Sequence, residues 1–275
     1  MRAMRHIAPA LACGLTIFPL PVQAAALLAP HRAVYDLSLG EASEESGIIG
    51  IAGRMVYEFG GSACNGYTTK FRMVTQIETE DATRLSDMQT TSFEEGDGRS
   101  FDFVSKNYLD QKLDKEVKGV ASLRPAGTTV RLEKPEAKTL ELERTQFPTQ
   151  HLLELIDKAR AKETFYQTTL FDGSEDADEV TTTTAVIGHR TPVAASDPER
   201  KAIDGLANDS YWPVEIAYFD LSEGNGEETP SYRISFKLHD NGVTRDLTMD
   251  YGDFSVTGKL VDLELFDTKA DSCSH

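Results

Sequence analysis

Apolar and polar residues alternate one by one along most of this 275-residue chain. In the segment SYRISFKLHD (231–240), four apolar residues occupy the even positions 232–238 and polar residues occupy the odd ones. A period of two predicts β-strands with one buried and one solvent-facing side. Similar runs recur between turn signals such as EEGDG, RPAG and SEGNGEE, so we expect about 12–14 strands of ordinary length. Flat sheets of that size tend to curl, close or split. The pattern therefore predicts a mainly β protein with a curved antiparallel sheet.

Two local signals refine the strand prediction. The sequence DNG at 240–242, between RISFKLH and VTRDLTM, predicts a β-hairpin. In the last run the apolar phase changes, which predicts either a β-bulge near Gly258 or a sharp coil in the strand. One phase holds Phe254, Val256 and Leu260, and the other holds Val261, Leu263 and Leu265.

One segment in the middle of the chain has helical periodicity instead. In FPTQHLLELIDKARAKET, apolar residues recur at 152, 153, 156 and 159, which predicts a helix over Gln150–Lys162 with Thr149 as its N-cap. A single helix among so many strands suggests a plug or lid on the curved sheet. The polar stretch Ser196–Ser210 is expected to be a loop that carries at most a helical turn. With no internal repeat, residues 25–275 are expected to form one domain.

The first 24 residues have the organisation of a secretory signal peptide. Arg2 and Arg5 precede an apolar stretch from Ile7 to Leu20, and VQA ending at Ala24 is a small-residue cleavage site. The alternative is a lipoprotein signal acylated at Cys13, but the apolar stretch continues past Cys13 and PALA matches a lipobox poorly. No run reaches the length of a membrane-spanning helix. We therefore expect an exported chain that does not span a membrane.

The net charge of −17 becomes −19 without Arg2 and Arg5, because 26 Lys and Arg then face 45 Asp and Glu. Such a surface repels nucleic acid and anionic lipid.

Removal of Cys13 leaves two cysteines, Cys64 and Cys273. An even number in an oxidising compartment favours a disulfide. The alternative is a catalytic cysteine, and His31, His151, His189 and His239 are available as partners. The flanking sequences GGSACNG and DSCSH are turn-like, however, and match no nucleophile motif.

No motif predicts a catalytic site, a metal site or a cofactor. DGSEDADE (172–179) resembles a calcium loop, but Ala177 replaces the turn glycine and Thr183 stands where the bidentate glutamate belongs. GIIGIAG (47–53) lacks the helix that follows a phosphate-binding loop. The sequences HExxH, GxSxG and CxxC do not occur.

Two strands carry basic residues in their polar phase. Lys70 and Arg72 belong to one strand, and Arg233 and Lys237 to another. These faces either point to solvent or, if the curved sheet turns them inward, form a cationic cup. Such a cup would suit an anionic amphiphile, with Trp212 supplying apolar contact.

Several segments in order resemble the EipB family of periplasmic cell-envelope integrity proteins of Gram-negative bacteria. They are LAPHRAVYDLSL, FPTQHLLELIDKARA, LFDGSEDADEV, YWPVEIAYF and MDYGDFSVTGKLVDLELF. The resemblance implies a long antiparallel sheet coiled into a β-spiral or cup around one main helix, and a disulfide between Cys64 and Cys273. It also implies a role in the envelope, with tetratricopeptide-repeat proteins as partners, and a cup similar in shape to periplasmic lipid and lipoprotein carriers.

Three functions are compatible with these observations. The first is a non-enzymatic protein that holds an amphiphilic envelope component or a lipoprotein chain in the cup. The second is a ligand-free scaffold whose acidic surface docks a periplasmic partner. The third, a hydrolase acting on envelope glycan or lipid, is supported by no specific residue.

The predicted disulfide can be tested by unfolding. A bridge from Cys64 to Cys273 closes a loop of 209 residues, and the chain-entropy model then gives at most about 5 kcal/mol of stabilisation. We expect Cys64→Ser and Cys273→Ser each to lower the melting temperature of the mature protein substantially. The wild type under reducing conditions should match them, and a melting temperature that reductant leaves unchanged would contradict the bridge.

Overall fold

The computed structural model describes residues 28–174, 176–219 and 229–267. Strands dominate this part of the chain. In chain order the elements are β1 His31–Ala42, η1 Glu44–Ser46, β2 Ile48–Ser62, β3 Gly66–Thr79, β4 Thr83–Glu94, β5 Ser100–Leu109, β6 Lys112–Arg124, β7 Gly127–Lys134, β8 Lys138–Leu142, α1 Pro148–Arg160, β9 Phe165–Leu170, β10 Thr181–Ile187, β11 Thr191–Pro192, η2 Asp204–Leu206, β12 Ser210–Phe219, β13 Tyr232–His239, β14 Thr244–Asp250 and β15 Phe254–Leu265.

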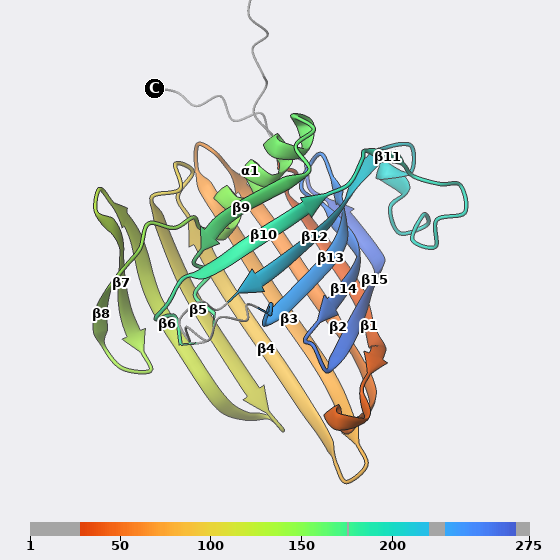
Figure 1. Cartoon of the computed structure of the whole chain (residues 1–275), viewed down its shortest axis with the longest axis horizontal. Coiled ribbons are helices and arrows are strands. Elements are labelled where there is room, and N and C mark those ends of the chain that lie inside the picture. Colours follow the sequence, from red (N-terminus) through yellow and green to blue (C-terminus); the bar gives the residue numbers. More distant parts are fainter. Residues whose placement is uncertain (1–27, 175, 220–228, 268–275) are drawn as a thin grey trace, which may run out of the picture.

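All 15 strands belong to one antiparallel sheet. Its order is β8-β7-β6-β5-β4-β3-β2-β1-β15-β14-β13-β12-β10-β9, with the two-residue β11 paired to β12. The first and last strands of the chain are therefore neighbours in the middle of the sheet. Figure 1 shows this sheet coiled, with α1 at one end of the coil. The predicted fold class, a long coiled antiparallel sheet with one main helix, is confirmed.

The sheet coils because its apolar face has to be buried. Side chains from both halves meet in one core, including Phe59 and Tyr67 from the first half and Ile216 from the second. The helix adds Leu155 and Ile156, which are 1% and 0% exposed. Removal of this apolar surface from water is the main force that drives folding. The helix thus packs its apolar face against the inner face of the sheet, and the structure contains the one main helix that was predicted as a plug or lid.

A second cluster fastens the start of the helix to the sheet. Phe101 and Phe103 of β5 pack against Phe147 and Phe171, with ring centroids 5.4–6.5 Å apart. Phe147 directly precedes the helix and Phe171 directly follows β9. These rings therefore join segments from three parts of the chain.

The two ends of the sheet are linked by the segment between β8 and α1. The N–H of Gln146 donates to the carbonyl of Thr169, 3.0 Å away, and the carbonyl of Gln146 accepts from the N–H of Phe171, also at 3.0 Å. Gln146 thereby pairs in parallel with Leu170 at the outer edge of β9. This edge would otherwise present unpaired backbone groups.

The start of the helix differs from the prediction. Phe147 is the N-cap, Pro148 is in the first turn, and no side chain of the cap residue bonds the helix. The predicted cap, Thr149, is instead a buried residue inside the first turn. Its N–H and that of Gln150 donate to the carboxylate of Glu94 from β4, at 2.7 and 3.0 Å. Burial raises the pKa of Glu94, and these hydrogen bonds offset part of that effect.

The other local predictions can be compared with the same structure. The DNG hairpin is confirmed between β13 and β14, with Gly242 at φ +86°. The bulge in β15 falls at Val261, three residues after Gly258, because Tyr35 pairs with Leu260 and Val34 with Asp262. The 196–210 stretch carries the helical turn η2. The predicted signal peptide (1–24) and Cys273 lie outside the described residues, so the cleavage and the disulfide stay predictions.

The contact between Glu94 and the helix can be tested directly. Glu94→Ala leaves the buried N–H of Thr149 and the partly buried N–H of Gln150 without an acceptor, so we expect a loss of about 2 kcal/mol in the free energy of unfolding. Urea unfolding followed by circular dichroism measures it. The neighbouring Glu95 is exposed, and Glu95→Ala is the matched control. Equal stabilities of the two variants would contradict the proposed anchoring.

Candidate functional site

A cavity of about 410 Å³ lies between the inner faces of β2–β6 and the first half of α1. Its volume is within the range of small-molecule sites and at the lower end of it. The helix contributes Pro148, Thr149 and Leu152 to the lining. The cavity is therefore positioned by the same sheet curvature and helix placement that build the core.

One side of the cavity is apolar. Tyr57 and Phe59 of β2, Phe71 of β3 and Phe101 of β5 line it, together with Leu152 from the helix. Tyr57 faces Phe71 across the strand pair. An apolar ligand could bury its surface against such a wall.

The cavity lining also includes neutral polar groups. Thr69, Thr90, Ser92 and Ser105 line it with their hydroxyl groups, and Asn107 adds an amide. Strand register explains why they meet, since Thr90 lies between Phe71 and Ser105, and Thr69 lies opposite Ser92. The hydroxyl oxygens of Thr90 and Ser105 are 3.3 Å apart.

Two charged residues also line the cavity, Lys115 and Asp172. Lys115 pairs with Asp176, with 3.0 Å between Nζ and Oδ1, and both side chains are partly exposed. Asp172 accepts a hydrogen bond from the N–H of Ser174 at 2.9 Å. The charges among the described lining residues thus balance.

The residues predicted to bind a ligand do not lie in this cavity. Phe71 points into it, so its neighbours Lys70 and Arg72 point to solvent, where they pair with Glu58 at 2.7 Å and Asp87 at 2.9 Å. Arg233 is also exposed and pairs with Asp250 at 2.8 Å, while Trp212 is buried in the core. Together with Lys237, described below, these five residues are not brought together. Their role in ligand binding stays untested.

A sequence signal for the cavity residues existed but was missed. In β5, Phe101, Phe103, Ser105 and Asn107 share one phase of the alternation. The first two are buried core residues, so small polar groups at the next two inward positions interrupt an apolar face. A break of this kind on the inner face of a curved sheet indicates a polar lining.

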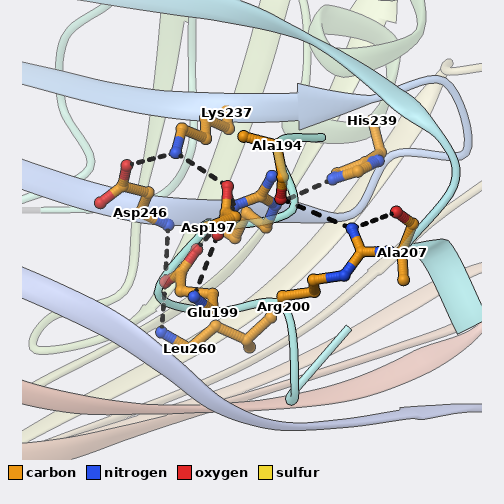
Figure 2. Close-up of polar contacts among 10 residues, drawn as sticks. Ala194, Asp197, Glu199, Arg200, Ala207, Lys237, His239, Asp246 and Leu260 are labelled. Atoms are coloured by element: carbon orange, nitrogen blue, oxygen red, sulfur yellow. Dashed lines mark hydrogen bonds and ion pairs between the residues drawn. The ribbon is translucent and has the colours of Figure 1, made fainter. Parts of the chain in front are cut away.

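A buried ionic cluster lies elsewhere in the fold, where the 194–209 loop contacts β13, β14 and β15. Arg245 is fully buried, and its guanidinium donates to Asp197 and Glu199 at about the same distance of 3.0 Å. Lys237 joins through Asp197 at 3.3 Å and Asp246 at 2.8 Å. Figure 2 shows the two carboxylates of the loop directed at these strands. Lys237 is therefore part of a cluster that ties a loop to the sheet.

His239 completes the cluster in its neutral form. The Nε–H of Arg245 can only donate, so Nε2 of His239 accepts at 3.0 Å and its Nδ1–H donates to Asp209 at 2.9 Å. Burial lowers the pKa of His239, which agrees with a neutral ring. Burial raises the pKa of Asp197, but the N–H of Glu199 and the charge of Arg245 outweigh this and the pKa lies below its usual value.

Glu199 also accepts backbone hydrogen bonds at the point where β14 and β15 separate. The last ladder pair is Leu247 with Gly258. Beyond it, Oε1 of Glu199 accepts from the N–H of Leu260 at 2.7 Å and from the N–H of Asp246 at 3.1 Å. Asp246 has a left-handed φ of +54°, and Leu260 precedes the bulge at Val261. The carboxylate thus replaces ladder hydrogen bonds that the irregular strands cannot make.

The described residues contain neither a candidate metal site nor a candidate membrane-spanning helix. In the ranges 28–174, 176–219 and 229–267, no three His, Cys, Asp or Glu side chains gather as a metal site. Over the same ranges no helix has the length and apolar character needed to cross a membrane.

These features define a class: an open, barrel-like β protein with a helix and a small cavity inside its curl. Within this class the chain belongs to the EipB-like family, whose model matches residues 22–267. It is 53% identical over 267 residues to the cell envelope integrity protein EipB of Brucella abortus (strain 2308), covering 94% of each chain. A crystal structure of a beta-barrel-like protein of a domain of unknown function, from Brucella abortus, matches with a TM-score of 0.84. The identity is 54%, and the match covers 88% of this chain and 100% of the other.

The role of Glu199 can be tested by removing its charge. Glu199→Gln leaves Arg245 partly uncompensated and turns an amide toward N–H donors, so we expect a loss of about 3 kcal/mol in the free energy of unfolding. Guanidinium chloride titration measures it. Glu264 is exposed on β15, and Glu264→Gln should remain within about 0.5 kcal/mol of the wild type. A Glu199→Gln variant as stable as this control would show that the cluster does not hold the loop.

Proposed function

We propose that this protein is a non-enzymatic factor of the bacterial envelope that holds an amphiphilic molecule in the cavity under α1. The observation that carries the proposal is the cavity itself, which is lined both by apolar side chains and by neutral polar groups. Ligand sites of this kind combine apolar surface with a few placed polar groups. The name of the Brucella relative supports a role in envelope integrity.

Export to the periplasm is part of this proposal. The first 24 residues have the pattern of a signal peptide cleaved after Ala24, and Cys64 and Cys273 would be oxidised to a disulfide there. An amphiphile in the aqueous periplasm needs its hydrocarbon part shielded from water. A cavity inside a stable coiled sheet provides that shield.

A matched pair of substitutions on β4 tests the proposal. Thr90 lines the cavity, and the adjacent Thr91 is exposed on the opposite face of the strand. We expect Thr90→Trp to fill the cavity, to remove copurifying amphiphile seen by native mass spectrometry, and to sensitise cells to envelope stress. Thr91→Trp should leave both readouts as in the wild type. Ser105→Leu, a smaller insertion into the same cavity, must act in the same direction as Thr90→Trp.

The competing proposal is a scaffold that binds a periplasmic partner, such as a tetratricopeptide-repeat protein, without a ligand. On that view the solvent-facing residues decide function. Folded Thr90→Trp and Ser105→Leu variants that protect cells fully would contradict the amphiphile proposal. The scaffold would be supported if charge reversal at exposed acidic positions abolished the protection of cells while the cavity variants still protected them.

A further inference from the structure

The inward rows of the sheet place polar groups beside apolar ones in the cavity. One row runs Tyr57, Phe71, Thr90, Ser105 and Val117 across β2 to β6. A parallel row places Asn107 between Met88 and Lys115. Most of the hydroxyl and amide groups therefore lie on β4 and β5, with Thr69 on β3, while the aromatic rings lie on β2 and β3 except for Phe101 on β5. A bound molecule would place its polar part against β4 and β5.

This polar part has no excess of positive charge. Lys115, which alone carries a positive charge among the described lining residues, is paired with Asp176, and Asp172 adds a negative charge to the lining. The basic strand faces at Lys70/Arg72 and at Arg233 point away from the cavity and are paired with carboxylates. A buried anion would therefore meet no compensating charge, which makes its desolvation costly.

Asn107 supplies a specific recognition group. Its Oδ1 is buried and has no hydrogen-bond partner, although buried polar atoms are almost always paired. Thr90 and Ser105 lie on the same inner face as hydroxyls that both donate and accept. Together they fit a headgroup that carries hydroxyl or amide N–H donors.

We propose that the cavity selects amphiphiles with an uncharged, hydroxyl- or amide-bearing headgroup and excludes anionic ones. This inference rests on the proposed function and specifies its ligand class. The apolar wall takes a hydrocarbon chain, and a cavity of about 410 Å³ restricts the ligand to a small headgroup with one chain. A headgroup donor pairs with Oδ1 of Asn107, and the hydroxyls of Thr90 and Ser105 complete the contacts.

Two probes of equal chain length test the selection. Binding of 1-monododecanoylglycerol, a neutral diol, and of dodecane-1-sulfonate, a permanent anion, is measured by calorimetry on the mature protein below the micelle concentration of each. We expect the neutral probe to bind at least tenfold more tightly. Asn107→Leu and the near-isosteric Thr90→Val should each weaken the binding of the neutral probe about tenfold. Neither substitution should change the affinity for the anionic probe. Thr91→Val, on the outer face of the same strand, is the control.

The outcomes separate this inference from the proposed function. The headgroup selection is overturned if the sulfonate binds as tightly as the neutral probe or more tightly. It is also overturned if neither Asn107→Leu nor Thr90→Val changes the binding of the neutral probe. The proposed function survives that result if Thr90→Trp abolishes binding of either probe. No binding of either probe overturns the headgroup selection, and protein that is also empty when purified from the periplasm overturns both.

Discussion

The need to bury one apolar face of a single continuous sheet governs this structure. A sheet of 15 antiparallel strands has too much apolar surface to leave one side in water, and no second sheet covers it within the described residues. The sheet therefore turns its apolar face inward, and α1 fills part of the space. The cavity is the part of this interior that the helix and the side chains of β2–β6 leave unfilled. Packing and binding thus derive from the same curvature.

Three devices satisfy backbone groups that the strands and the helix leave without a partner. Gln146 pairs with the outer edge of β9. Glu94 accepts the free N–H groups at the start of α1. Glu199 accepts two N–H groups where β14 and β15 separate, and Arg245 neutralises its charge. In each case a side chain or segment distant in sequence satisfies a backbone group that its own strand or helix leaves unpaired.

The sequence predicts the regular parts of this fold and not these devices. Alternation along segments such as SYRISFKLHD is a local property of a strand with one buried face, so it predicts the strands. The DNG turn and the helical spacing of apolar residues are equally local, and they predict the hairpin and the central helix. The hydrogen bonds at the start of the helix could not be predicted, because their acceptor, Glu94, is 55 residues away from Thr149. Asp197 and Glu199 lie in a stretch with the composition of a surface loop, and the distant Arg245 compensates the charges that their burial brings into the fold.

The candidate site was predicted less well, for a physical reason. Period two separates the two faces of a strand but gives no weight to a small polar residue on the inner face, such as Ser105 or Asn107. The basic residues drew attention because they stand out in an acidic chain. Cross-strand pairing with carboxylates, as between Arg72 and Asp87, explains their presence on the outer face. Sequence therefore indicated the coiled sheet correctly, whereas the basic residues that it selected as ligand-binding candidates lie outside the cavity.

The chain has a single tryptophan, and its position gives the protein a useful spectroscopic property. Trp212 is 3% exposed in β12, the guanidinium of Arg190 lies 4.9 Å from its ring, and its side chain does not line the cavity. Its fluorescence therefore reports on the integrity of the β12–β13 half of the core rather than on what the cavity contains. Emission from this one indole can separate loss of structure from loss of a bound molecule in the same sample.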